Sequence, residues 1–113
     1  MSKMAETLRR KKCAPCEGGT KPMTAAQVGH FLQGLPGWEF GDGRIRRTFR
    51  FANYHETMAF VNATAWISHR EDHHPDIALG YNQVTVAYMT HSIGGISEND
   101  FICAAKIDAL LDI

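Results

Sequence analysis

Residues 38–51, WEFGDGRIRRTFRF, contain the clearest indication of the fold. Their Gly41-Asp42-Gly43 step is a tight-turn sequence of the hairpin type. In the run that follows, Ile45, Phe49 and Phe51 share one side, and arginines dominate the other. This alternation predicts two short antiparallel strands, the second of which buries one face and presents a cationic one.

A helix is predicted before this hairpin. Thr24 and Gln27 form a capping-box pattern, in which each side chain satisfies a free backbone N–H group. Apolar residues then recur at the spacing of one helix face, and Gly34 with Pro36 ends the helix. These apolar residues are Val28, Phe31, Leu32 and Leu35.

A longer helix is predicted after the hairpin. Asn53 is its candidate N-cap, with Glu56 three residues further on. The helix extends toward residues 70–72, since Pro75 disfavours helical conformation in the residue before it. Its apolar face is wide, and we expect Trp66 to add bulk to it as a core residue.

The pattern of residues 76–91 predicts two strand-like runs, or one bulged run, and a last helix follows. Apolar residues alternate over 77–81 and again over 84–90. Ser97 is the candidate N-cap of the last helix. That helix is apolar on more than one side, so we expect it to be deeply buried or packed against another subunit. The order α-β-β-α-β-β-α predicts an α+β fold, an antiparallel sheet with helices on one face.

Length and charge limit the domain organisation. The chain has 113 residues and a mass of 12.6 kDa, which fits one domain. Its 12 basic and 12 acidic residues balance, but basic residues outnumber acidic ones within residues 1–21. We expect residues 1–21 to form a flexible basic tail and residues 22–113 to form a single domain.

Composition also limits the partners and the location. The net acidic body after residue 21 offers no obvious surface for nucleic acid. No apolar run approaches the roughly 20 residues that span a bilayer. The N-terminus lacks the apolar core of a secretory signal. We therefore expect a cytoplasmic protein with no nucleic-acid or membrane partner.

Cys13 and Cys16 form a C-x-x-C pair within the expected tail. Such a pair is either an incidental feature of a flexible segment or a redox or metal-binding element. A redox site normally opens a helix after a strand, and no strand is predicted before Cys13. Both interpretations stay open. Cys103, by contrast, is expected to be a core residue of the last helix.

Four of the six histidines lie within residues 69–91. Imidazole has an ordinary pKa of about 6.5, so it can give and take protons near neutral pH. The His73-His74-Pro75 cluster is either part of a general acid/base site or a set of capping groups at a helix end. A third interpretation is a zinc site made by His69, His73 and His91.

The spacing of these residues resembles a known family. The pattern His69-x3-His73-His74-Pro75-x5-Tyr81-x9-His91-x8-Asp100 is similar to the signature of pterin-4a-carbinolamine dehydratases. The resemblance spans roughly residues 24–113. Its further features are Leu35-Pro36-Gly37-Trp38, Phe49-x-Phe51, Tyr81-Asn82-x-Val84 and Asp100-x3-Ala104.

This resemblance implies a fold, an assembly and a reaction. The implied fold is a four-stranded antiparallel sheet with three helices on one face, assembled as a homodimer or homotetramer. No metal and no bound cofactor is implied. The implied lyase removes water from 4a-hydroxytetrahydropterin, the product that aromatic amino acid hydroxylases leave, and yields quinonoid dihydropterin. That reaction belongs to the recycling of a tetrahydrobiopterin-type cofactor.

The resemblance also implies the catalytic residues. Loss of water requires a proton for the departing 4a-hydroxyl group and removal of a proton from a ring nitrogen. His73 is expected to be the principal acid/base, and His91 the second. His74 is expected to bind and orient the pterin.

Further residues are expected to support these histidines or to line the pocket. Asp100 would orient or polarise one imidazole, with help from Asp72 and His69. The expected substrate-binding residues are His73, His74, Pro75, Thr90, His91, Ser92 and Ile93.

Other classes of function stay open at this point. The same fold could serve as a non-enzymatic dimerisation or binding module, and bound zinc would instead favour a metal-dependent hydrolase. The intact set of three histidines favours the dehydratase, because a pure scaffold has no need of acid/base groups.

Overall fold

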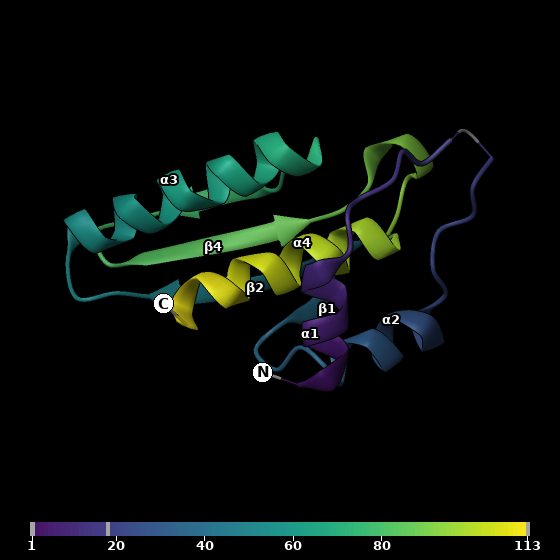
Figure 1. The fold of residues 1–113 in the computed structure, drawn as a ribbon, viewed down its shortest axis with the longest axis horizontal. Coiled ribbons are helices and arrows are strands. Elements are labelled where there is room, and N and C mark those ends of the chain that lie inside the picture. Colours follow the sequence, from purple (N-terminus) through teal and green to yellow (C-terminus); the bar gives the residue numbers. More distant parts are fainter. Residues whose placement is uncertain (1, 18, 113) are drawn as a thin grey trace.

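The structure is a computed structural model that describes residues 2–17 and 19–112. In these residues four strands form one antiparallel sheet in the order β1-β2-β4-β3. The strands are β1 (Glu39–Gly41), β2 (Arg44–Arg50), β3 (Asp76–Leu79) and β4 (Gln83–Tyr88). The helices are α1 (Lys3–Arg10), α2 (Ala25–Leu32), α3 (Tyr54–Glu71) and α4 (Glu98–Ala109), with 3₁₀ turns η1 (His91–Ile93) and η2 (Leu110–Asp112) (Figure 1). The predicted α+β class and antiparallel sheet are confirmed.

The predicted hairpin joins β1 to β2 through a two-residue turn. Asp42 and Gly43 have φ angles of 53° and 74°, in the left-handed region. Two consecutive positive φ angles are the geometry of the tight hairpin turn that Asp-Gly favours. Gly41 therefore pairs with Arg44, and this register places Ile45 and Phe49 on the buried face of the sheet.

The core lies between the sheet and the helices. In the central pair of strands, β2 pairs Ile45 with Tyr88 and Phe49 with Val84 of β4. These four side chains are buried, and each such burial contributes on the order of 1.5–3 kcal/mol. The alternation predicted for both strands therefore corresponds to one buried face, onto which α3 and α4 pack (Figure 1).

Helix α3 is bounded as predicted but buries a narrower face than expected. Asn53 accepts a hydrogen bond from the Glu56 backbone N–H at its start, and Asp72 ends it with a φ of 51°. Its buried residues are Thr57, Phe60 and Thr64. At about 100° per residue, Trp66 lies half a turn away from that stripe. Trp66 is 62% exposed, so the prediction that it belongs to the core is wrong.

The expected N-terminal tail contains an additional helix, α1. Ser2 caps it by accepting a hydrogen bond from the Ala5 backbone N–H, and Ala5 and Leu8 are buried. Helix α1 crosses and packs against α4 (Figure 1). Residues 3–10 are therefore not a flexible tail. Their helix is too short to be stable alone, and it depends on contacts with α4 that the N-terminal residues by themselves do not reveal.

The last helix, α4, is buried on nearly all sides. Its residues 99–105 and 107 are buried, and Phe101 stacks on Phe31 of α2 with ring centroids 5.0 Å apart. The sequence predicted that this apolar helix is either deeply buried or packed against another subunit. Within the single chain α4 is already deeply buried, because α1 covers it. Within the described residues, we find no helix with both the length and the apolarity that crossing a membrane would require.

Candidate active site

The His73 side chain is held between a carboxylate and an aromatic ring. It follows the left-handed residue Asp72, and its backbone N–H donates to the Ser68 carbonyl (3.2 Å). Its Nε2 atom lies 2.6 Å from Oδ1 of Asp100. The imidazole also lies flat against Tyr88, with centroids 5.6 Å apart and planes at 12°. These contacts fix both the position and the plane of the ring.

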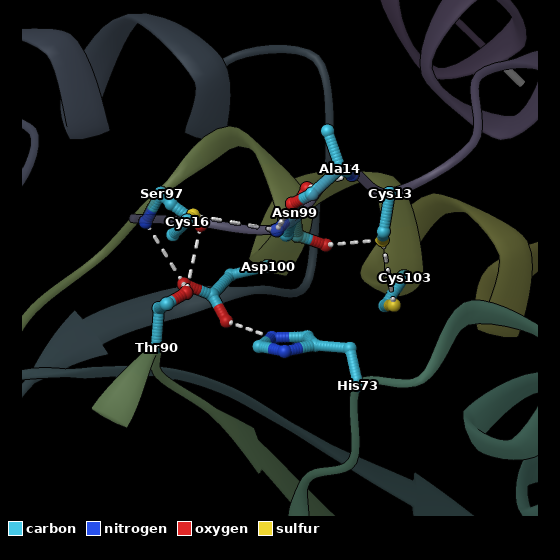
Figure 2. A network of polar contacts seen from close by, with 9 residues as sticks. All are labelled: Cys13, Ala14, Cys16, His73, Thr90, Ser97, Asn99, Asp100 and Cys103. Carbon is cyan, nitrogen blue, oxygen red and sulfur yellow. Dashed lines mark hydrogen bonds and ion pairs between the residues drawn. The ribbon is translucent and has the colours of Figure 1, made fainter. Parts of the chain in front are cut away.

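Asp100 is fully buried at the start of α4 and accepts hydrogen bonds on both oxygens. Its Oδ2 accepts from the Ser97 backbone N–H and from the Thr90 hydroxyl, each at 2.9 Å. The Thr90 and Ser97 hydroxyl oxygens are 2.7 Å apart. Because Thr90 gives its proton to Asp100, the Ser97 hydroxyl donates to Thr90. Figure 2 shows this network with the His73 ring at its edge.

This arrangement assigns the proton of the imidazole. An ionised carboxylate only accepts hydrogen bonds, so Nε2 of His73 carries a hydrogen and donates it to Asp100. In the neutral ring, Nδ1 is then the atom that can accept a proton. When it does so, the positive charge forms next to a buried carboxylate, which stabilises it. The pair therefore has the chemistry of an oriented general base that can return its proton as an acid.

A cavity of about 270 Å³ lies beside His73. Residues 70–73, at the end of α3 and directly after it, form one wall, and the N-terminal residues 12–16 form another. Thr90, Ser92 and Asn99 complete the lining. A larger hollow of about 460 Å³ lies elsewhere, next to Arg47 and Asp108, and none of the histidines lines it. The smaller cavity is the candidate site, since His73, which Asp100 holds from behind, lines it.

Part of the predicted site is assembled at this cavity. Asp72, His73, Thr90 and Ser92 line it, and Asp100 supports His73 from behind. This grouping was predicted only through the family resemblance, because Asp100 and His73 are separated by 27 positions.

The other predicted residues lie outside the lining. His74 and His91 are exposed, although each directly follows a residue of the cavity, and Pro75 and Ile93 are half-buried. His69 is exposed on α3, with its ring 5.5 Å from that of Trp66.

The zinc interpretation is not supported by this arrangement. Among residues 2–17 and 19–112, no three His, Cys, Asp or Glu side chains are grouped closely enough to hold a metal ion. His69, His73 and His91 therefore do not form the cluster that this interpretation requires.

The sequence analysis missed the N-terminal wall of the cavity. Cys13 and Cys16 are half-buried rather than part of a free tail, and Sγ of Cys13 lies 3.6 Å from Sγ of the core residue Cys103. The hydrogen bond with Cys13, together with burial, raises the pKa of the Cys103 thiol, so this thiol stays protonated. No signal in residues 12–16 alone predicts their position, since their partners lie more than 50 residues away.

Tyr88 is a second residue that was missed. Its place on a buried strand face was predicted, but its contact with His73 was not. The alternation of a strand indicates which side of the sheet a ring occupies, not which side chain from another segment lies upon it.

Comparisons with known proteins show the family of this chain. The family model described as pterin 4 alpha carbinolamine dehydratase matches residues 21–110. A protein of Nitrosomonas eutropha, provisionally named a pterin-4-alpha-carbinolamine dehydratase, is 60% identical over 105 residues, which cover 92% of this chain and 93% of that one. One of Nitrosospira multiformis with the same provisional name is 55% identical over 113 residues and all of both chains.

Two solved structures are also similar. One is a transcriptional coactivator/pterin dehydratase from Brucella melitensis, with a TM-score of 0.76 and 32% identity, covering 80% of this chain and 98% of that one. The other is a pterin dehydratase-like protein described as a RuBisCO assembly factor in the alpha-carboxysome. It has a TM-score of 0.58 and 28% identity, and covers 67% of this chain and 90% of that one. By its matched region and by these relatives, the chain belongs to the pterin 4 alpha carbinolamine dehydratase family.

Proposed function

We propose that this protein catalyses the dehydration of 4a-hydroxytetrahydropterin to quinonoid dihydropterin. The observation that carries the proposal is the His73–Asp100 pair, in which a fully buried carboxylate holds a cavity-lining imidazole at 2.6 Å. Family membership supports the substrate class. The tetrahydrobiopterin-type recycling context is part of the proposal.

The reaction needs one proton delivered and one removed. The C4a–O bond breaks as a proton reaches the departing hydroxyl group, and water leaves. A ring nitrogen gives up its hydrogen, and its electron pair forms the new C=N bond. General acid/base catalysis by a positioned imidazole typically contributes about 10²- to 10⁴-fold.

His73 is the principal acid/base in this proposal. Its Nδ1 accepts a proton from the substrate, while Asp100 stabilises the imidazolium through Nε2. Asp72 helps by ending α3 in a left-handed conformation directly before His73. Because the His73 imidazole is already oriented, less entropy is lost on reaching the reactive geometry, and the activation free energy of the dehydration is lower.

His74 and His91 complete the proposed site from its exposed side. His91 is proposed as the second acid/base, because it directly follows Thr90 of the Asp100 network. His74 is proposed to bind the pterin, together with Pro75, Ser92 and Ile93. His69, near the end of α3 and four residues before His73, is proposed to support the site indirectly.

The test is the dehydration rate of freshly generated 4a-hydroxytetrahydropterin, followed spectroscopically with a chelator present. Wild type should accelerate the reaction, and His73→Ala should lose at least about 10² of that acceleration. His55→Ala is the matched control, since His55 is an exposed histidine in the first turn of α3. Full activity in a folded His73→Ala variant would refute the assignment.

A non-enzymatic binding module is the alternative function. It is favoured by the likeness to the pterin dehydratase-like protein described as a RuBisCO assembly factor. If folded wild-type protein gives no acceleration in the same assay, this alternative replaces the dehydratase.

A further inference from the structure

Residues 12–16 lie outside the region that the family model matches, yet they line the cavity of His73 and are hydrogen-bonded to the residues around it. The Cys13 backbone N–H donates to Oε1 of Glu71 at 2.8 Å, near the end of α3. The Ser92 hydroxyl donates to the Cys16 carbonyl at 3.3 Å. The segment is thus attached to elements on both sides of His73, and this attachment makes it a wall of the cavity.

Asn99 holds the middle of this segment with two hydrogen bonds. The Ala14 backbone N–H donates to Oδ1 of Asn99 at 3.1 Å, and Nδ2 of Asn99 donates to the Ala14 carbonyl at 2.6 Å. The Asn99 side chain therefore bonds both the N–H and the carbonyl of Ala14, as a residue of a neighbouring β-strand would. Its Nδ2 also lies 3.5 Å from Sγ of Cys16. Asn99 is buried and directly precedes Asp100, so one turn of α4 holds both the wall and the His73 carboxylate (Figure 2).

The two sides of the cavity differ in chemistry. His73 and Thr90 supply ionisable and hydroxyl groups on one side. The wall of residues 12–16 carries one charged side chain, Lys12, whose Nζ donates to the Arg70 carbonyl at 3.0 Å. Its other side chains, from Cys13 to Cys16, are small, and Pro15 has no backbone N–H to donate. A flat heterocycle with polar edges matches such a pair of walls. The volume of about 270 Å³ lies just below the range of roughly 300–1,000 Å³ that is typical of small-molecule sites.

We propose that residues 12–16, clamped by Asn99, form a substrate-binding wall that positions the pterin ring against His73. This inference rests on the proposed dehydratase function and adds Asn99 as a positioning residue. The clamp lets the wall be present before substrate arrives, so less ordering is needed on binding. Loosening it weakens substrate binding and leaves the His73–Asp100 chemistry intact.

The experiment compares Asn99→Ala with wild type in the full chain. KM should rise at least about fivefold, while kcat stays within about twofold. The affinity for 7,8-dihydrobiopterin, a stable pterin probe, should fall by a similar factor in a fluorescence titration. Amide hydrogen exchange should accelerate in residues 12–16 and stay unchanged in residues 69–73, which a general loss of structure would not produce.

Two further variants make the test specific. Ala14→Pro removes the backbone N–H that donates to Asn99 and should reproduce the KM increase; it serves if Asn99→Ala fails to fold. Lys11→Ala is the matched control, because Lys11 directly precedes the segment and its exposed ion pair with Glu98 lies outside the cavity lining. It should leave KM unchanged.

The outcomes separate this inference from the proposed function. If wild type neither binds the probe nor dehydrates the substrate, the proposed function fails. If wild type is active and both clamp variants keep the wild-type KM, residues 12–16 do not position the substrate. The proposed dehydratase function is then unaffected. A lower KM in the clamp variants would overturn the proposal too, because the segment would then obstruct the site.

Discussion

The imidazole of His73 lies nearly parallel to the phenol ring of Tyr88, at a centroid distance of 5.6 Å. Tyr88 thereby supports the face of the ring whose edge Asp100 holds. Burial raises the pKa of the Tyr88 phenol far above its ordinary value, so the ring stays neutral beside His73. Its buried hydroxyl has no partner with hydrogen-bond geometry in the described part of the chain.

Tyr88→Phe should therefore preserve the site and stabilise the protein. The phenyl ring keeps the stacking surface, and removal of an unpaired buried hydroxyl should raise the free energy of unfolding by up to about 1 kcal/mol. Urea unfolding and the dehydration rate check both points. Tyr88→Leu is the contrasting variant, since it loses the flat surface and should lower kcat. A large destabilisation by Tyr88→Phe would mean that the hydroxyl is paired.

Asp100→Asn should lower kcat at least about 10²-fold with a smaller effect on KM. The amide carries no charge to stabilise the imidazolium of His73, and its NH₂ group cannot accept the hydrogen bonds now made to one carboxylate oxygen. We expect a loss of about 1–3 kcal/mol in stability from those unpaired donors. Rates measured below the unfolding midpoint separate the two effects. An unchanged kcat would remove Asp100 from the mechanism.

Asp108 should make stability decrease as the pH rises above its ordinary pKa. Burial raises the pKa of Asp108, and hydrogen bonds from Trp38 together with the Arg47 charge oppose the shift. Since the net pKa is raised, the folded state holds the proton more tightly than the unfolded state, and deprotonation costs stability. The window begins at the ordinary value of 3.8 and extends upward.

The measurement for Asp108 is urea unfolding of wild type and Asp108→Asn from about pH 4 to pH 7. The stability of wild type relative to the variant should fall across this range, because other titrating groups cancel in the difference. A difference that grows in favour of wild type as the pH rises would show that the Arg47 pair outweighs burial.

Leu8→Ala should destabilise the protein by about 2–5 kcal/mol. Leu8 belongs to α1, which packs against α4, and its side chain is buried in the core, so its truncation leaves a cavity there. Thr7→Ala on the exposed side of α1 is the control and should change stability by no more than about 0.5 kcal/mol. If both substitutions change the free energy of unfolding by equally small amounts, α1 does not contribute to the stability of the fold and the prediction is wrong.

The edge strand β3 should carry the subunit contact of a homo-oligomer. The outer edge of β3 has no strand partner among the described residues, and Ile77 and Leu79 are 37% and 45% exposed. Unpaired apolar edges favour association with another chain. Sedimentation should show a dimer or tetramer for wild type and a smaller species for Leu79→Lys. Phe40→Ser is the control at the opposite edge, on β1. A monomeric wild type would contradict this prediction.

Local structure was largely readable from the sequence. The caps at Thr24 and Asn53 and the Asp42-Gly43 turn depend on groups within a few residues of one another. Strand alternation likewise reports which face of the sheet is buried, and it identified Val84, Val86 and Tyr88. These features follow from short-range geometry, so one sequence suffices to predict them. The paired roles of His73 and Asp100 were predicted only from the family pattern.

The tertiary structure decided what depends on distant partners. It placed α1 on α4, turned Trp66 away from the core, and brought residues 12–16 to the cavity through Asn99. Each of these depends on packing between segments far apart in the chain, and such packing overrides weak local preferences. The sequence by itself therefore determined the elements, their caps and the buried faces of the sheet. Only the packed chain decided which side chains meet at the site, because a contact between distant residues has no short-range signature.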